Sequence, residues 1–523
     1  MTREGLGAGG SRLRAFRASA WQGGLPPSRV PRFGAASALA AVALALAPVF
    51  AQAPAHTFDS SLILSQSKDE RLAQDRPDWK ALEPEMMRQF QAVLRFDTRN
   101  PPGNEHIVAE YLKGVFDQAG IPAQIFALDA NRSNVVARVK GSGKKKPLLI
   151  LGHSDVVTVD EAKWKFPPFS ATRDGGWVYA RGTVDDKDNL TGGLMTMLLL
   201  KRYNVPLDRD VIFLSEAGEE GSSNFGMQFM VNQHYPEIES EYCLAEGGGA
   251  IRIGGVAKYT TVETLEKIPR GIELVAHGIS GHGSIPLKSN AIVHLAGAVA
   301  KVGQWRPEIR FNETTGTYFR GLATIAAPEN AKYYRDVLST DPKLRAAADE
   351  WLFENEPLHS SMLRTSVSPN IFAGGYRSNV IPSEAKATLD VRALPDEDPV
   401  TFLEQVKKVV DDPAVDVHFT AQNVRPASAF DARLDSEPYK VLEAAAKRIY
   451  NTITLPTMST GATDMAALRT RGVQCFGIGA AIDMEDGPKG FGMHSDQERL
   501  LETELYRFVR YNYEVVVDLA RAK

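Results

Sequence analysis

The order of predicted strands and helices constrains this 523-residue chain more than any other feature, because one α/β pattern is interrupted by a second pattern and then resumes. Short apolar stretches alternate with longer amphipathic ones from Asn134 to Ala245, as in a sheet with helices on both faces. The same alternation returns with a strand at Val473 to Gly477 and a closing helix at about Glu502 to Ala520. We therefore predict a mixed α/β sheet flanked by helices, with another domain inserted into it.

The inserted region has its own order, which is strand, helix, strand, strand, helix, strand. These elements are predicted at Gly271–Gly278, Asn290–Val302, Asn370–Gly374, Glu384–Leu394, Pro399–Val410 and Val415–Thr420. This βαββαβ order is the ferredoxin-like one, and residues 305–368 add further helical material. The length of the chain also favours two folded domains. We expect a signal peptide at 1–51, a linker at 52–77, the first part of the α/β domain at 78–267, the inserted domain at 268–426 and the second part at 427–523.

The first fifty residues have the composition of an export signal. Arginines, among them Arg12, Arg14, Arg17, Arg29 and Arg32, precede the apolar run Ala35 to Phe50. This run is too short to span a bilayer comfortably but suits the core of a signal peptide. Cleavage is expected after Ala51, with a second candidate after Ala53. We therefore expect a periplasmic or secreted protein with no stable membrane span after processing; an uncleaved N-terminal anchor is the alternative.

Charge and cysteine content exclude some functions. A net charge of −4 and a pI near 6.3 give no basic surface field, so no nucleic-acid partner is expected. Cys243 and Cys475 do not form a CxxC or Cys/His pattern that would hold zinc. We expect both to be small buried apolar residues, and a single disulfide is the alternative.

Acidic and histidine side chains follow several predicted strands, at the ends where open α/β sheets place their sites. The residues are His153 and Asp155 in HSDVV, Asp185 in RGTVDD, Glu219 and Glu220 in AGEEGSS, Glu246 in AEGGG and His494 in GMHSDQE. Taken singly, each has an ordinary explanation: a hydrogen-bonded structural histidine, a solvated glutamate pair or a helix N-cap. Together they would repel one another at one sheet edge unless cations lay among them.

The number of these side chains matches two divalent ions. Two histidines, two glutamates and one aspartate make five ligands, and a bridging Asp185 would give each metal three of them. Zinc accepts this mixture of nitrogen and oxygen, and a zinc pair can polarise a carbonyl and lower the pKa of water; cobalt or manganese could replace it. Glu219 is left without a metal, as a general base requires. Asp155, two residues after His153 on the same side of an extended chain, can accept the other imidazole N–H.

These motifs, with Trp164 and Pro167-Pro168-Phe169 between them, resemble the motif series of the co-catalytic zinc family that contains aminoacylases, glutamate carboxypeptidases and succinyl-diaminopimelate desuccinylases. The resemblance runs from about Trp79 to the C-terminus. It implies that His153 and Glu246 hold one zinc, that Glu220 and His494 hold the other, and that Asp185 bridges them. It also implies a cis peptide between Asp185 and Asp186.

The same resemblance assigns roles in the inserted domain. His282 in GHGSIP resembles the lid histidine that reaches a neighbouring subunit and stabilises the oxyanion, which implies a homodimer formed through the lid; an exposed turn histidine is the alternative. Asn379 and Arg392 resemble substrate-binding residues, the guanidinium being suited to a carboxylate. Gly461 resembles part of a carboxylate-facing loop, and Arg425 is a weaker substrate-binding candidate. The HSDQE sequence and the large insertion depart from the commoner family pattern.

These inferences converge on metal-assisted amide hydrolysis. Glu219 would take a proton from the attacking water and return it to the leaving amine, and His282 would help to hold the oxyanion. The expected substrate is a peptide or an N-acyl amino acid with a free carboxylate, and the EGGG sequence favours the carboxypeptidase-like branch. An aminopeptidase with a similar zinc pair and a catalytically silent exported binding protein are the alternatives.

Overall fold

The computed structural model describes residues 77–420 and 432–522. The predicted signal peptide, its cleavage sites, almost all of the predicted linker and Arg425 lie outside these residues. Among the described helices none is long and apolar enough to cross a membrane.

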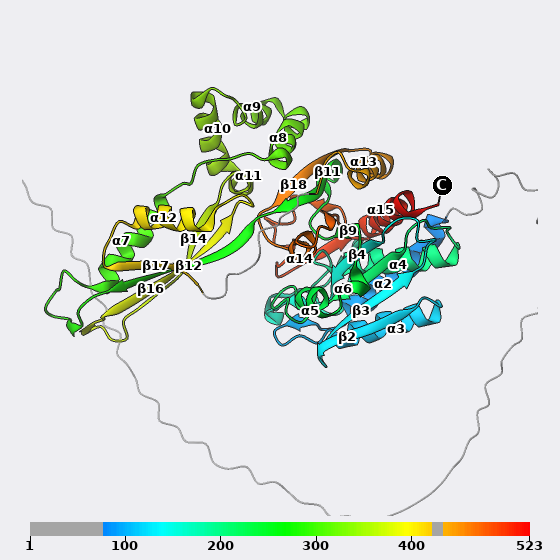
Figure 1. Cartoon of the computed structure of the whole chain (residues 1–523), viewed down its shortest axis with the longest axis horizontal. Coiled ribbons are helices and arrows are strands. Elements are labelled where there is room, and N and C mark those ends of the chain that lie inside the picture. Colours follow the sequence, from blue (N-terminus) through cyan, green and yellow to red (C-terminus); the bar gives the residue numbers. More distant parts are fainter. Residues whose placement is uncertain (1–76, 421–431, 523) are drawn as a thin grey trace, which may run out of the picture. The chain divides into compact units, whose positions relative to one another are not determined.

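A ten-stranded mixed sheet forms the framework of the larger part of the fold (Figure 1). Its hydrogen-bonded order is β2 (Ala123–Asp129), β3 (Arg132–Val139), β8 (Val211–Glu216), β4 (Leu148–His153), β9 (Tyr242–Ala245), β19 (Gln474–Gly477), β11 (Val256–Glu266), β10 (Gly249–Ile253) and β20 (Ile482–Asp483), and β18 (Ile453–Ser459) pairs with β11. The central strands β8, β4, β9 and β19 run parallel. Their carboxyl ends therefore meet at one edge of the sheet.

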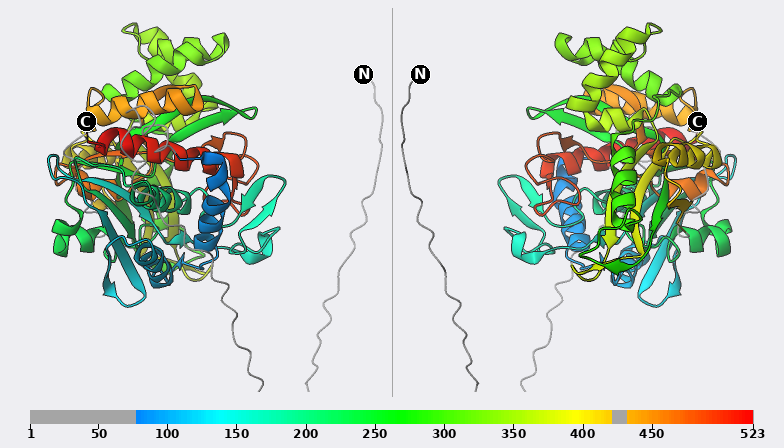
Figure 2. Two further views of the ribbon diagram at one scale, coloured as in Figure 1. Left: turned by 90° about the vertical axis from the view of Figure 1, so that its right-hand side faces the viewer. Right: turned by 90° about the vertical axis from the view of Figure 1, so that its left-hand side faces the viewer.

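Helices cover both faces of this sheet, and successive strand residues face opposite layers. Leu148 and Ile150 of β4 join one apolar core, while Leu149 and Leu151 join the other. The first core is closed by α2 (Trp79–Leu94), α3 (His106–Gln118), α4 (Lys187–Arg202), α13 (Glu437–Tyr450) and α15 (Glu502–Ala520). The second is closed by α5 (Met227–Gln233), α6 (Tyr235–Ile238) and α14 (Met465–Arg469). Figure 2 shows α13 and α15 side by side, in orange and red.

The two cysteines lie in the interior of the sheet. Cys243 in β9 is directly opposite Cys475 in the neighbouring strand β19. Both are buried and free. The prediction that they act as small buried apolar residues is confirmed, and the alternative of a disulfide is not.

Two small sheets pair segments that are distant in sequence. The strand β1 (Arg99–Asn100) pairs with β5 (Val156–Val157). The strands β6 (Thr172–Asp174), β7 (Trp177–Tyr179) and β21 (Arg499–Leu501) form the other sheet. A short 3-10 helix, Glu161–Lys163, lies between β5 and β6.

A separate four-stranded antiparallel sheet follows β11 in the chain. Its order is β14 (Ser366–Gly374), β16 (Glu384–Ala393), β12 (Ile268–His277) and β17 (Val415–Phe419). The helices α7 (Ala291–Gln304) and α12 (Pro399–Val410) pack along one face (Figure 1), where their apolar residues share a core with the sheet. The two-residue strands β13 (Gly281–His282) and β15 (Val380–Ile381) pair beside it.

The region between α7 and β14 is helical, as the sequence predicted. It contains α8 (Glu313–Ile325), α9 (Pro328–Asp336), α10 (Pro342–Asn355) and α11 (Pro357–Met362). Phe319 and Leu352 of these helices share an apolar core with Leu265 of β11 and Leu455 of β18. The helical insertion is therefore fastened to the extended strands of the ten-stranded sheet.

Candidate metal centre

Five side chains predicted as metal ligands come together in space, although they are widely separated in sequence. Three of them end or follow parallel strands: His153 is the last residue of β4, Glu220 follows β8 and Glu246 follows β9. Asp185 lies just before α4, and His494 lies in the loop before β21. The strand ends and two loops therefore meet at the edge of the sheet where the sequence placed the site.

Asp185 lies between the two histidines. Its Oδ1 is 3.0 Å from Nε2 of His153, and its Oδ2 is 2.9 Å from Nε2 of His494. Glu246 lies on the His153 side, with Oε2 3.6 Å from Nε2 of that imidazole. Glu220 lies on the His494 side, with Oε1 2.9 Å from Nε2. The side chains therefore form two sets of three candidate ligands, which share the Asp185 carboxylate.

The carboxylates of this cluster favour positive charge among them. Burial opposes a charge on His153, yet its contacts with Asp155, Asp185 and Glu246 raise its pKa well above the ordinary value. Asp185 and Glu220 raise the pKa of His494 to about 10. The neighbouring carboxylates therefore favour the protonated, positively charged form of both imidazoles. Imidazole nitrogen and carboxylate oxygen are also ligands that zinc and related divalent ions accept, so the residues fit two such ions.

Asp155 is held more tightly than the sequence implied, and by different groups. Its carboxylate is fully buried and accepts the backbone N–H groups of residues 218, 219 and 220 at 2.9–3.1 Å. The side-chain amide of Asn100 donates a further hydrogen bond of 2.8 Å. Burial opposes ionisation of Asp155, but contact with His153 and these N–H donors hold its pKa below the ordinary value.

The contact of Asp155 with His153 differs in detail from the prediction. The imidazole Nδ1 lies 3.0 Å from the backbone carbonyl oxygen of Asp155 and 3.6 Å from its carboxylate. The carbonyl is thus the nearer acceptor for the second imidazole N–H. The carboxylate instead fixes the loop that carries Glu219 and Glu220.

Glu219 lies in this loop, next to the cluster. Burial raises the pKa of its carboxyl group well above the ordinary value, and the neighbouring charge of Glu246 raises it further. A raised pKa suits a group that must accept a proton near neutral pH.

The predicted oxyanion-stabilising residue His282 and the predicted substrate-binding residues lie in other places. His282 is exposed, and its Nδ1 contacts the Ser284 hydroxyl at 2.7 Å. It lies beside Asn379, because Gly283 N–H donates to the Asn379 carbonyl. Among the residues that the structure describes, the hydrogen bonds of His282 stay within this turn and do not reach the cluster of five.

Arg392 and Gly461 also lie apart from that turn. Arg392 is on β16 and donates from Nε to Asp390 at 2.9 Å. Gly461 follows β18, and its N–H donates to the Ser459 hydroxyl. The structure therefore gives Arg392 a carboxylate partner within its own strand, with about a third of its side chain exposed.

Three residues near the cluster were missed by reasoning from the sequence. Asp186 places a carboxylate oxygen within 4.8 Å of a ring nitrogen of His153 and of a carboxylate oxygen of Glu246, and its carboxylate accepts the His153 backbone N–H. Asn100 and Glu498 contact the segments that carry the predicted ligands. Only weak signals pointed to two of them: Asn100 precedes two prolines, and Glu498 ends the unusual HSDQE motif. The expected cis peptide between Asp185 and Asp186 is present.

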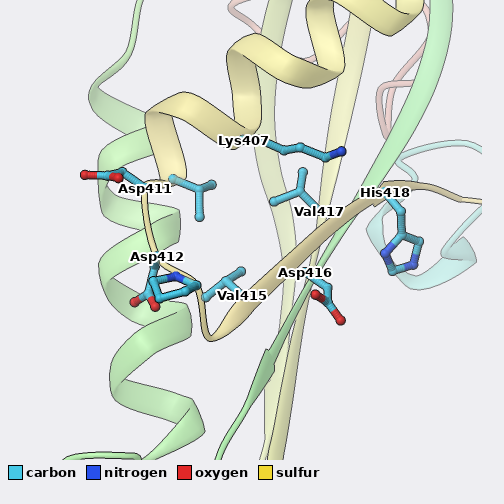
Figure 3. A pocket seen from close by; sticks show the side chains of 9 residues that line it. Lys407, Asp411, Asp412, Val415, Asp416, Val417 and His418 are labelled. Carbon is cyan, nitrogen blue, oxygen red and sulfur yellow. The ribbon is translucent and has the colours of Figure 1, made fainter.

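A hollow lies elsewhere, between the end of α12 and β17 (Figure 3). It has a volume of about 670 Å³. Two of its carboxylates already have histidine partners: Asp412 contacts His294 at 2.7 Å, and Asp416 contacts His277 at 3.1 Å. Figure 3 shows the Asp411 carboxylate directed away from Asp416. Its polar groups do not converge on one point, so we do not assign it a ligand.

The mixed sheet carries acidic and histidine side chains at its carboxyl edge, an arrangement that could hold metal ions and that suits a metal-dependent hydrolase. The family model "Peptidase family M20/M25/M40" matches residues 149–518, and the chain belongs to this family of metallopeptidases and amidohydrolases.

Curated relatives of the chain carry several related names. It is 29% identical over 328 residues to the "N-fatty-acyl-amino acid synthase/hydrolase PM20D1" of Homo sapiens, covering 61% of this chain and 64% of that protein. It is 29% identical to the "Probable carboxypeptidase S-like 2" of Dictyostelium discoideum, covering 61% and 62%. A "Probable succinyl-diaminopimelate desuccinylase" of Staphylococcus aureus is 27% identical, with 58% and 68% covered. The matched region thus spans less than two thirds of the first two relatives.

Solved structures share the fold. An M20 family metallo-carboxypeptidase from Sulfolobus solfataricus superposes with a TM-score of 0.61 at 20% identity, covering 83% of this chain and 98% of that one. Human carnosine dipeptidase 1 gives a TM-score of 0.60 at 14% identity, covering 85% and 98%. At these identities the likeness concerns the fold alone.

Proposed function

We propose that the chain is a two-zinc amidohydrolase that cleaves the amide bond of a peptide or N-acyl amino acid bearing a free carboxylate. The observation that carries this proposal is the position of Asp185, whose two oxygens face two different imidazoles at 3.0 and 2.9 Å. His153 and Glu246 would hold one ion, and Glu220 and His494 the other. Ions bound there would act as Lewis acids on the substrate carbonyl and on water.

The protein residues would supply the proton transfers. Glu219 would accept a proton from the attacking water and return it to the nitrogen of the leaving amine. Asp155 would keep Glu219 in place, because it holds the Glu219 and Glu220 backbone N–H groups at 3.1 Å. A fixed base avoids the cost of reorganisation during the reaction.

The free carboxylate of the substrate is the feature that we expect to set its class. Arg392 is the proposed partner, and it would exchange its present contact with Asp390 for a bidentate contact with the substrate. The names of the relatives include an N-fatty-acyl-amino acid synthase/hydrolase, a probable carboxypeptidase and a probable succinyl-diaminopimelate desuccinylase. Each name is compatible with an amide next to a carboxylate.

The first test is substrate cleavage with a matched base variant. Purified protein loaded with zinc should release free amine from N-acyl amino acids or dipeptides, and Glu219→Gln should lower kcat by about 10²–10⁴-fold with zinc content unchanged. Glu239→Gln, which changes an exposed glutamate, is the control and should keep wild-type kcat. Full activity in Glu219→Gln would remove Glu219 as the base.

The same assay separates the alternative functions. An aminopeptidase would cleave amino-acid amides with a free amine and leave N-acyl amino acids intact, whereas the proposed enzyme does the reverse. A silent binding protein would cleave neither, although it could still bind metal.

We further propose that residues 268–426 are an inserted lid of ferredoxin-like order through which two chains associate. Large apolar side chains are exposed on α7, on the edge strand β14 and in the following turn: Val293, Ile371, Phe372 and Tyr376. Exposed apolar patches of this kind mark contact surfaces. His282, exposed in the same domain, would then reach the metal centre of the other chain.

Mixing variants tests this arrangement. Glu219→Gln and His282→Asn should each be nearly inactive as purified homodimers. Mixed dimers would regain activity, because one site then combines an intact Glu219 with an intact His282 from the other chain. No regain after subunit exchange, or a single-chain mass in light scattering, would exclude action between subunits.

A further inference from the structure

Glu498 is a buried carboxylate that gathers donors from one short loop. Its side chain is fully buried. Oε2 accepts from Arg181 Nη1 at 2.7 Å and from the Gly182 N–H at 3.1 Å. Oε1 accepts from the Val184 N–H at 2.9 Å and from the Thr183 hydroxyl at 3.3 Å. Four consecutive residues are therefore fixed by a single side chain.

These contacts join two segments that each carry a candidate metal ligand. The loop that Glu498 holds leads directly into Asp185, and Glu498 itself follows His494 by four residues. The backbone continues the connection, because the Ala180 N–H donates to the Glu498 carbonyl and β21 pairs with β7 from the next residue onward. These contacts therefore tie the loop before Asp185 to the segment that carries His494.

Breaking the buried ion pair between Arg181 and Glu498 would destabilise the fold. Arg181 is 2% exposed, and its guanidinium lies over the Trp164 ring, 5.3 Å from the centroid. A buried pair that loses one member leaves an unpaired charge away from water, which is strongly destabilising. The pair is thus suited to hold one fixed arrangement.

The two sets of ligands differ in how much they depend on Glu498. His153 and Glu246 are anchored by β4 and β9, which are paired neighbours in the centre of the sheet. His494 lies in an irregular loop, with a half-exposed imidazole and a positive φ of 59°. It lacks support from a central strand.

We propose that Glu498 is a positioning residue that sets the distance between Asp185 and His494, and with it the affinity of the ion shared by Asp185, Glu220 and His494. This inference rests on the proposed two-metal function. It makes a specific claim: loss of Glu498 weakens one of the two ions selectively. A merely structural role would destabilise the whole chain or weaken both ions equally.

The test is metal binding to protein from which metal has been removed, measured with zinc and a competing chelator. We expect wild-type protein to bind two ions. Glu498→Gln keeps the shape of the side chain but removes its charge and leaves some of the four donors without an acceptor. Loss of such an outer contact commonly weakens metal binding by about 10–100-fold, so the second affinity should fall by this factor while the first stays unchanged.

Glu502→Gln is the matched control. Glu502, whose side chain is 15% exposed, forms an ion pair with Arg173 at 2.5 Å. This pair joins β6 to the start of α15 and does not include a residue of the Asp185 loop. Both zinc affinities of this variant should equal those of the wild type.

Each outcome decides the proposal. Two unchanged affinities in Glu498→Gln, or two affinities weakened equally, would overturn the role of Glu498 while leaving the two-metal function intact. Wild-type protein that binds no zinc would overturn both. If Glu498→Gln does not fold, the variant Thr183→Val is measured instead, because it removes one donor to Glu498 and keeps the ion pair with Arg181. A several-fold loss of affinity for the second zinc ion supports the proposal, and unchanged affinities overturn it.

Discussion

The side-chain amide of Asn100 donates a 2.8 Å hydrogen bond to the buried carboxylate of Asp155, across 55 positions of sequence. Asp155 in turn holds the loop that carries Glu219 and Glu220. Asn100 therefore supports the proposed base through one intermediate residue.

Replacing Asn100 tests this support. Asn100→Ala removes one donor from a buried charged acceptor, a loss of about 1.5–3 kcal/mol, and it should lower both the melting temperature and kcat. Asn100→Asp should be worse, because it places a second carboxylate against Asp155 in a buried site. Thermal melts and amine-release kinetics of the two variants give the order directly. An aspartate variant as active as the alanine variant would contradict it.

Removal of metal should expose the repulsion within the cluster. Chelator-treated protein should melt at a lower temperature than zinc-loaded protein, since an ion that binds only the folded chain adds about 2.7 kcal/mol at a free concentration 100 times its Kd. Zinc, cobalt or manganese should restore both the melting temperature and activity. Differential scanning fluorimetry is the measurement.

Asp185→Asn is the informative comparison for that experiment. It replaces the carboxylate shared by both sets of ligands, so the rise in melting temperature on adding zinc should be much smaller than in the wild type. An equal rise in the variant would mean that zinc stabilises the chain from some other position.

The framework of the fold and the site could be predicted from the sequence because both depend on local patterns. The strands β4, β8 and β9 are short apolar runs between polar residues, and Glu220, Glu246 and His153 lie at or just after their ends. A parallel arrangement of such strands brings those residues together without further information.

The remaining features depend on contacts that no local pattern records. The strand β11 contains three threonines and two glutamates, yet both glutamates, Glu263 and Glu266, are buried beside Arg469, which lies about two hundred residues further on. Its polar sequence gave no sign of a core strand. The roles of Asn100 and Glu498 likewise follow from partners that are distant in sequence.

A pH dependence of stability is expected from the pair of His294 and Asp412, whose Nδ1 and Oδ2 are 2.7 Å apart. The contact with Asp412 raises the pKa of His294, and the contact with His294 lowers the pKa of Asp412. The second imidazole nitrogen can donate to the Lys288 carbonyl at 3.2 Å, so the protonated ring has two acceptors. Lys301, whose charge also lowers the pKa of Asp412, is the other ionisable group beside the pair.

The directions of these two pKa shifts determine how stability changes with pH. The raised pKa of His294 stabilises the folded chain fully at pH values below the pKa of this residue in the unfolded chain, which is about 6.5. This stabilisation is lost as the pH rises through the pKa of His294 in the folded chain. The lowered pKa of Asp412 stabilises the folded chain at pH values above the pKa of this residue in the unfolded chain, which is about 3.9. This stabilisation is lost as the pH falls through the pKa of Asp412 in the folded chain. His294→Gln should therefore lower the melting temperature more at pH 5.5 than at pH 9. His277→Gln, at a more exposed pair with Asp416, is the control and should have little effect at either pH.

Gly193 allows a close contact beneath the sheet that an alanine would disturb. It lies in the buried helix α4, which begins two residues after Asp185, and a Cβ added there would lie 2.8 Å from Phe213 and 2.9 Å from Ile150. Alanine gains about 1 kcal/mol of helix propensity over glycine, but overpacking in a core costs about 1–3 kcal/mol. We therefore expect Gly193→Ala to lower the free energy of unfolding measured in urea. In Gly114→Ala, on α3, the new methyl group meets no atom within 4 Å, so the propensity gain should appear alone and stabilise the chain. If both variants were stabilised alike, the contact of α4 with the sheet would be looser than these distances indicate.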